Sequence, residues 1–174
     1  MEQILDAKGL TEAQAIDAYR KKNYPKPAMT ADIIVFAKQA DTYRVLLVTR
    51  KGHPFIRKLA LPGGFAHETE TIHETAAREL AEETGVEGLS LQMVGVYSTP
   101  DRDPRGWVVS VAFVSVVDAS LLSVQAGDDA AEADWFDFDG EVLGRNGARI
   151  ALDELAFDHA DILRDAWELV TKKN

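Results

Sequence analysis

The segment from residue 64 to residue 86, GFAHETETIHETAARELAEETGV, constrains the fold of this chain more than any other. Thr71 and Glu74 have the spacing of a capping box, in which two side chains satisfy free backbone N–H groups at a helix start. Good helix formers continue to Glu83, and Gly85 suits the left-handed residue that ends many helices. The spacing therefore predicts one helix over residues 72–84.

This predicted helix concentrates negative charge beside an apolar surface. At about 100° per residue, its apolar face comprises Ile72, Ala76 and Leu80. Glu83 projects among these residues, Glu79 lies at their edge and Glu82 lies further round. A carboxylate in such a place is costly to desolvate unless a cation compensates its charge. Oxygen ligands in a chain without cysteine favour Mg²⁺ or Mn²⁺ over structural zinc.

An alternative is that the same acids form an ordinary solvated helix face, with Arg78 paired to Glu74 and Glu82. The sequence directly upstream, Leu61-Pro62-Gly63-Gly64, argues against this alternative. Paired glycines let a backbone approach a ligand closely and expose its carbonyl groups. The combination favours a metal site.

The segment also matches a known signature, G-x5-E-x7-R-E-U-x-E-E-x-G-U with U aliphatic. It does so at every defined position, namely Gly64, Glu70, Arg78, Glu79, Leu80, Glu82, Glu83, Gly85 and Val86. It therefore resembles the Nudix box. The resemblance implies an α/β/α sandwich and hydrolysis of a diphosphate by attack of a metal-activated water on phosphorus.

The resemblance also implies individual roles. The implied metal ligands are Glu79, Glu83, Glu82 and the carbonyl group of Gly64, with Glu82 serving a second metal or acting through water. Arg78 would orient the glutamates by salt bridges, and Glu70 would brace the loop against the helix. The carboxylate that takes the proton from water varies among Nudix enzymes, so the general base stays open here.

Two further stretches resemble one branch of the family, the ADP-ribose pyrophosphatases. Residues 126–135, AGDDAAEADW, are similar to its GDDAxEAxW segment and offer Glu132 as a catalytic candidate. The alternative for Glu132 is a residue of a solvated acidic loop at a strand edge.

The second stretch is residues 100–106, PDRDPRG, which resembles RDPRG in ADP-ribose hydrolases and in Nudix-type regulators of NAD metabolism. Arg102 and Arg105 on this proline-stiffened loop could make bidentate contacts with phosphate or ribose. The alternative is a charge-balanced surface turn with the neighbouring aspartates. Arg50, at the end of a predicted strand, could also contact a phosphate.

The remaining pattern predicts an α/β or α+β domain with a mixed sheet between helices. With 174 residues, 46% of them hydrophobic, the chain fits one domain over residues 1–174. Helices are expected at 11–22 and 155–172, and an extended segment at 24–27 follows the first of them. The expected strands are 30–38 and 44–50, paired as an antiparallel hairpin, and then 91–98, 107–117 and 133–138.

Composition limits the partners. A net charge of -10 and a pI near 4.8 oppose non-specific binding of nucleic acid, which requires clustered cations. A small anionic nucleotide can still be recruited locally by Mg²⁺ and a few arginines. The sequence has neither the apolar core of a signal peptide nor a membrane-spanning stretch, which favours the cytoplasm. A homodimer is expected from the resemblance alone.

Other residues give weaker signals. The four histidines, His53, His67, His73 and His159, lack ligand spacing and are expected at the surface or in local hydrogen bonds. Trp135 and Trp167 are expected in the core. Tyr97 and Trp107 are the aromatic candidates for contact with adenine.

The function that these features predict is Mg²⁺-dependent hydrolysis of a nucleoside diphosphate linked to another moiety. ADP-ribose, giving AMP and ribose 5-phosphate, is the substrate that the resemblance favours. Two alternatives remain: a nucleoside triphosphate pyrophosphatase with the same box, and a non-catalytic module that senses ADP-ribose or a related metabolite.

Overall fold

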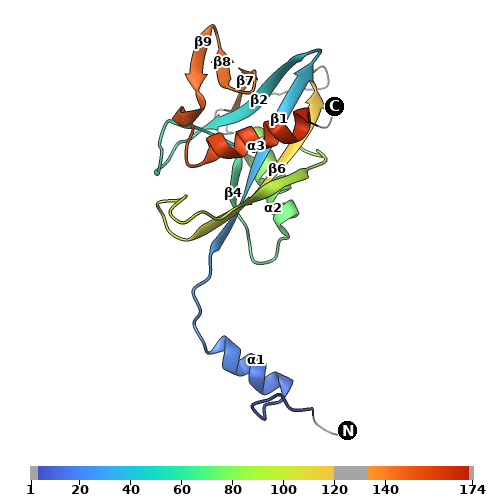
Figure 1. Cartoon of the computed structure of the whole chain (residues 1–174), viewed down its shortest axis with the longest axis vertical. Coiled ribbons are helices and arrows are strands. Elements are labelled where there is room, and N and C mark those ends of the chain that lie inside the picture. The colour runs from blue at the N-terminus through green and yellow to red at the C-terminus, as the bar shows by residue number, and fades with distance from the viewer. Residues whose placement is uncertain (1–3, 120–132, 173–174) are drawn as a thin grey trace.

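The computed structural model describes residues 4–119 and 133–172. Helix α1 (Glu12–Arg20) begins at the expected place, because Thr11 and Gln14 form the predicted capping box. An extended segment then separates α1 from the rest of the chain (Figure 1). Within the described part of the chain, α1 has no buried residue. This helix therefore gains no packing from the sheet that follows it.

One mixed sheet dominates the molecule. Its strands in the described residues are β1 (Ala28–Gln39), β2 (Thr42–Thr49), β3 (Leu59–Ala60), β4 (Gly63–Phe65), β5 (Gln92–Tyr97), β6 (Val108–Asp118), β7 (Ala133–Phe138), β8 (Val142–Arg145) and β9 (Ala148–Ala151). Their order is β5-β6-β1-β2-β7-β8-β9, with β3 paired to β2 and β4 to β1. β1 and β6 are parallel, and the other pairs are antiparallel. The predicted hairpin is β1–β2.

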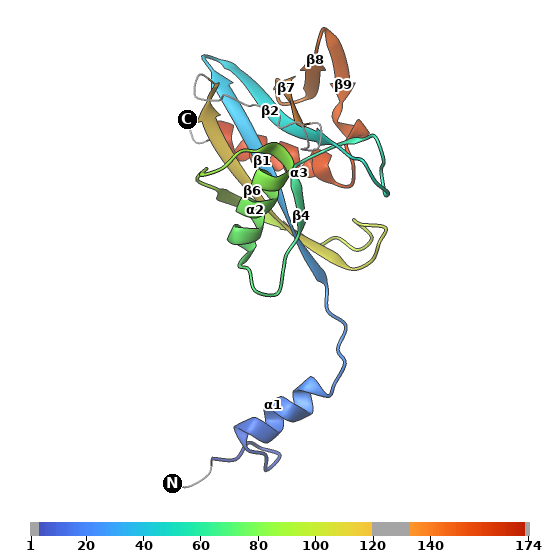
Figure 2. The ribbon, with the colours of Figure 1, turned by 180° about the vertical axis from the view of Figure 1, so that it is seen from behind.

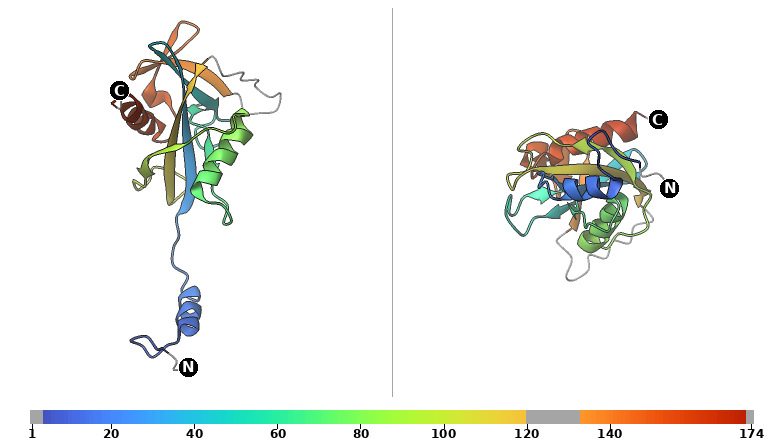
Figure 3. Two further views of the ribbon diagram at one scale, coloured as in Figure 1. Left: turned by 90° about the vertical axis from the view of Figure 1, so that its right-hand side faces the viewer. Right: turned by 90° about the horizontal axis from the view of Figure 1, so that it is seen from below.

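Two helices cover opposite faces of this sheet (Figure 3). α2 (Ile72–Thr84) packs on the face formed by β1 and β4, and α3 (His159–Thr171) lies against β5 and β6 (Figure 2). The predicted sandwich of a mixed sheet between helices is confirmed. No helix in the described residues is both long and apolar enough to span a membrane.

The central strand β1 shows why both faces need a cover. Its side chains alternate between two cores, since Ile33 and Val35 pack with the α2 side, and Ile34 and Phe36 pack with the α3 side. A strand that is buried on both faces reads as a continuous apolar run. Asp32 is the charged exception in this buried stretch, with 7% of the residue exposed.

The C-terminal region differs from the prediction. The helix expected from residue 155 starts at His159, and a short 3-10 helix, Leu152–Glu154, precedes it. Leu155 is extended and Phe157 has a φ of 53°, so the backbone cannot be helical through this segment. The expected core role of Trp167 is confirmed, because its ring packs edge-on against Phe36 and Phe138.

Candidate active site

The helix that carries the glutamates, α2, forms at the residues that the sequence predicts. Thr71 accepts a hydrogen bond from the backbone N–H of Glu74, and the Glu74 carboxylate accepts one from the backbone N–H of Thr71 at 2.7 Å. Gly85 closes the helix with a φ of 70°. The predicted bounds of this helix, residues 72–84, are confirmed. Because Glu74 serves the cap, its pairing with Arg78 in the solvated-face alternative is wrong.

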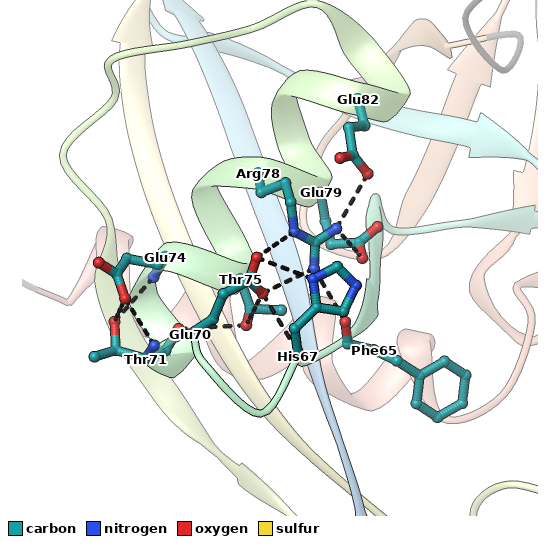
Figure 4. Close-up of polar contacts among 9 residues, drawn as sticks. All are labelled: Phe65, His67, Glu70, Thr71, Glu74, Thr75, Arg78, Glu79 and Glu82. Carbon is teal, nitrogen blue, oxygen red and sulfur yellow. Dashed lines mark hydrogen bonds and ion pairs between the residues drawn. The ribbon is translucent and has the colours of Figure 1, made fainter.

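Arg78 instead joins the loop to the helix (Figure 4). Its Nε donates to Glu70 Oε1 at 2.7 Å, and its Nη1 donates to Glu79 Oε1 at 2.7 Å and to Glu82 Oε2 at 3.1 Å. Its Nη2 donates to the carbonyl oxygen of Phe65 on β4 at 3.1 Å. The hydrogen bond from Arg78 lowers the pKa of Glu70 to about 2. One guanidinium group thus joins Glu70 to Glu79 and Glu82 of α2 and fixes these two helix residues relative to the glycine loop.

The glycine loop approaches α2 closely at two points. The backbone N–H of Gly63 donates to Glu83 Oε2 at 2.9 Å. A Cβ atom on Gly64 would lie 2.4 Å from the carboxylate carbon of Glu79, so only glycine fits there without movement. Burial, and then the negative charge of Glu79, raise the pKa of Glu83 to about 7, although the Gly63 hydrogen bond opposes this shift. The predicted desolvation of Glu83 is confirmed.

The chemistry of this donor set fits a hard divalent cation. The helix presents the carboxylates of Glu79, Glu82 and Glu83 beside the loop, and such oxygen atoms are the ligands that Mg²⁺ prefers. Among the described residues, no three His, Cys, Asp or Glu side chains already converge on one point. Glu79 and Glu82 are held by Arg78, and Glu83 by Gly63. A cation would offset the repulsion that Glu83 receives from Glu79.

A cavity of about 400 Å³ lies beside Glu83 and the glycine loop, and neither Glu79 nor Glu82 is among its lining residues. Elements far apart in the sequence contribute to it: β1, the end of β2, the glycine loop, α2, the loop at 102–105 and the start of α3. Of the predicted site residues, the cavity brings together Arg50, Gly64, Glu83, Arg102 and Arg105. Glu132 lies outside the described residues.

The three predicted substrate arginines differ in how they are held. Arg102 is 5% exposed at its side chain and donates two hydrogen bonds to Asp158, at 2.7 and 2.5 Å. Arg105 is 41% exposed and makes a bidentate pair with Asp103, with its shortest contact at 2.7 Å. Arg50 donates from Nε to the carbonyl oxygen of Pro54 at 2.8 Å and forms no salt bridge with any other described residue. Their contacts with substrate stay predictions.

Sequence reasoning missed a buried polar network on the wall of this cavity. Asp32 Oδ2 accepts from Ser110 Oγ at 2.5 Å, and Asp32 Oδ1 lies 3.5 Å from His159 Nε2. His159 Nδ1 in turn accepts from the backbone N–H of Leu61 at 2.9 Å, which places the proton of the neutral ring on Nε2. The expectation that His159 is a surface or locally bonded residue is wrong. The one sequence signal for this network was Asp32, an acidic residue within an apolar strand.

The aromatic candidates for adenine contact lie away from the lining of this cavity among the described residues. Trp107, directly before β6, is 58% exposed, and the hydroxyl of Tyr97 on β5 donates to Asp165 Oδ2 at 2.8 Å. Phe65 and Phe157 are the aromatic residues that line it.

Comparison with known proteins identifies the family of the chain. The family model described as NUDIX domain matches residues 26–164. The chain is 40% identical over 149 residues to the ADP-ribose pyrophosphatase of Methanocaldococcus jannaschii, and this alignment covers 86% of this chain and 78% of that protein.

Solved structures agree with this match. A MutT/nudix family protein from Enterococcus faecalis has a TM-score of 0.78 and 34% identity, over 94% of this chain and 70% of that one. The Nudix domain of Shewanella oneidensis NrtR, crystallised with ADP ribose, has a TM-score of 0.73 and 29% identity, over 93% of this chain and all of that one. The family model covers most of the chain, and α2 carries the complete signature segment. The chain therefore belongs to the Nudix hydrolase family.

Proposed function

We propose that the protein hydrolyses the diphosphate bond of ADP-ribose to give AMP and ribose 5-phosphate. The observation that carries the proposal is the cavity itself. Arg50, Arg105 and Glu83 all line it, so cationic and metal-binding residues border one ligand space. The 40% identity with an ADP-ribose pyrophosphatase supports the choice of substrate.

The residues of the chain would divide the work as follows. Glu79, Glu82 and Glu83, with the carbonyl group of Gly64, would hold Mg²⁺ or Mn²⁺. The bound ion would neutralise phosphate charge and acidify the attacking water. Arg78 keeps Glu79 and Glu82 at fixed positions through its two contacts from Nη1. Such fixed groups need no reorganisation during the reaction.

The proton of the attacking water needs an acceptor. Glu132 stays a candidate by its resemblance to the acidic residue of the GDDAxEAxW segment. Glu82 is a second candidate, because its side chain is 58% exposed and retains one oxygen without a described hydrogen bond. Separate Glu132→Gln and Glu82→Gln variants would distinguish the two at saturating Mg²⁺, since loss of the base should remove one ionisation from the pH profile of kcat, whereas loss of a metal ligand should raise the Mg²⁺ requirement.

The test of the proposed function is a substrate panel. Phosphate release through a coupled phosphatase would be measured for ADP-ribose, NADH, sugar nucleotides, diadenosine polyphosphates and nucleoside triphosphates, with Mg²⁺ and with EDTA. A Mg²⁺-dependent preference for ADP-ribose is the expected result. Preference for a nucleoside triphosphate would support the alternative of a house-cleaning pyrophosphatase.

A second candidate function is sensing of ADP-ribose without turnover. The likeness to the NrtR Nudix domain, a structure that contains ADP ribose, favours it. The intact box favours catalysis, because sensing does not require the full set of glutamates. Tight binding of ADP-ribose in calorimetry, with no turnover of any compound in the panel, would support the sensor.

We also propose a homodimer. The support is α1, a helix without a buried residue, whose Ile16 and Tyr19 are 44% and 62% exposed. Isolated helices of this length are marginal in water, so packing against a second copy would stabilise it.

A further inference from the structure

Phe157 has a backbone conformation that a bulky residue rarely adopts. Its φ is 53°, in the left-handed region that glycine and asparagine tolerate and that phenylalanine disfavours. Residues held in this way cluster at functional sites, where the surrounding structure compensates for the strain. The strained residue here lies two residues before the start of α3, and it lines the candidate active site.

The strained backbone places the Phe157 ring against two cations. The guanidinium carbon of Arg50 lies 4.8 Å from the ring centroid, and that of Arg105 lies 5.5 Å from it. Both distances are within the range of attractive cation–π contacts. Phe55 packs edge-on against the ring at 4.8 Å, and His159 lies 5.3 Å away. The Phe157 ring therefore packs against Phe55 and His159 and also contacts both arginines.

The two arginines repel each other. Burial, and after it the positive charge of Arg105, lower the pKa of Arg50. Asp103 neutralises Arg105, whereas Arg50 has no salt-bridge partner among the described residues. Arg105 is also held from another direction, since its guanidinium carbon lies 4.8 Å from the centroid of Phe65. Two neighbouring guanidinium groups on a cavity wall are an arrangement that an anion would stabilise.

We propose that Phe157 is a positioning residue for substrate phosphate. Its ring orients Arg50 and Arg105 so that both can donate to one diphosphate in the cavity. The proposal rests on the proposed function insofar as ADP-ribose supplies that diphosphate. Phe157 itself would contact the guanidinium groups and not the reacting atoms.

The experiment uses inorganic pyrophosphate as the probe, titrated calorimetrically into the full chain in EDTA. Without a divalent cation, the arginines supply the principal attraction for the anion. Phe157→Leu keeps apolar packing against Phe55 but removes the π face, so pyrophosphate affinity should fall on the order of tenfold. Phe157→Tyr restores the face and should bind within about twofold of the wild type. For turnover of ADP-ribose, Phe157→Leu should raise KM by a similar factor and leave kcat within about threefold.

Phe157→Asn separates positioning from stability. Asparagine tolerates a positive φ better than leucine does, so the Asn variant should unfold at a temperature equal to or above that of the Leu variant. Its affinity for pyrophosphate should nevertheless be as low. A purely structural role predicts the opposite pattern, in which affinity follows the thermal midpoint across the variants.

Wild-type affinity for pyrophosphate in both Phe157→Leu and Phe157→Asn would overturn the proposal. Failure of the wild-type protein to bind pyrophosphate in EDTA would overturn it as well. If pyrophosphate binding depends on Phe157 but ADP-ribose is not hydrolysed, the positioning role stands and the proposed function is wrong.

Discussion

Gly64→Ala tests whether close contact between the glycine loop and α2 sets the position of the metal-binding carboxylates. A Cβ atom at residue 64 would lie 2.4 Å from Glu79 Cδ, and 2.4 and 2.5 Å from its two carboxylate oxygens. Ordinary contact begins at 3.4 Å. The carboxylate or the loop must therefore move by about 1 Å, the difference between 3.4 and 2.4 Å.

The size of the effect follows from what Glu79 contacts. Its Oε1 accepts from Arg78 Nη1 at 2.7 Å, and its side chain is only 14% exposed. A shift of about 1 Å lengthens this charge-assisted hydrogen bond, which can contribute roughly 1.5–3 kcal/mol. A misplacement of that size within a catalytic site can lower the rate on the order of 10²-fold. We expect kcat/KM to fall by about this factor and the Mg²⁺ requirement to rise.

The assay is the initial rate of AMP formation from ADP-ribose across a range of Mg²⁺ concentrations. Gly95→Ala is the matched control, because a Cβ atom there would meet its nearest neighbour, Tyr97, at an ordinary 3.7 Å. Thermal midpoints of both variants establish that the fold is intact. Turnover of Gly64→Ala within about threefold of the wild type, at an unchanged Mg²⁺ midpoint, would refute the reasoning.

The roles of Glu83, His159 and α1 can each be tested by one variant. Glu83→Gln keeps an acceptor for the Gly63 N–H but removes a desolvated charge, so Mg²⁺-dependent turnover should fall by more than about 10²-fold without loss of thermal stability. Near wild-type turnover would contradict the assignment of Glu83 as a metal ligand. Burial lowers the pKa of His159, although the charge of Asp32 opposes the shift. Because the unfolded chain then binds one more proton below about pH 6.5, the free energy of unfolding should fall with decreasing pH by up to about 1.4 kcal/mol per unit. His159→Gln should lose this contribution in urea titrations between pH 5 and 7, and an unchanged pH dependence would contradict it. Removal of residues 1–24 should convert a dimer into a monomer in light scattering, and an unchanged mass would exclude α1 from the interface.

Much of the fold could be predicted because its signals are local. The capping box, the apolar spacing and Gly85 all lie within α2, so its bounds agree with the prediction at both ends. The strands β1, β2, β5, β6 and β7 are predictable because each has a run of apolar or β-branched residues. β3, β4, β8 and β9 escaped prediction because two to four residues are too few to show a period.

The site, too, has a part that local sequence predicts and a part that depends on tertiary packing. The sequence by itself determined the glutamate helix, because the spacing of a helix decides which carboxylates share a face. Only the tertiary structure decided that Arg102 pairs with Asp158, 56 residues away, and that His159 holds the backbone of Leu61, 98 residues away. Such pairs depend on how strands and helices pack, and no local pattern encodes them. The positive φ of Phe157 was also decided by the tertiary structure, because no residue next to it in the sequence predicts this conformation. Packing of its ring against Phe55 and Arg50, which are distant in the sequence, stabilises it.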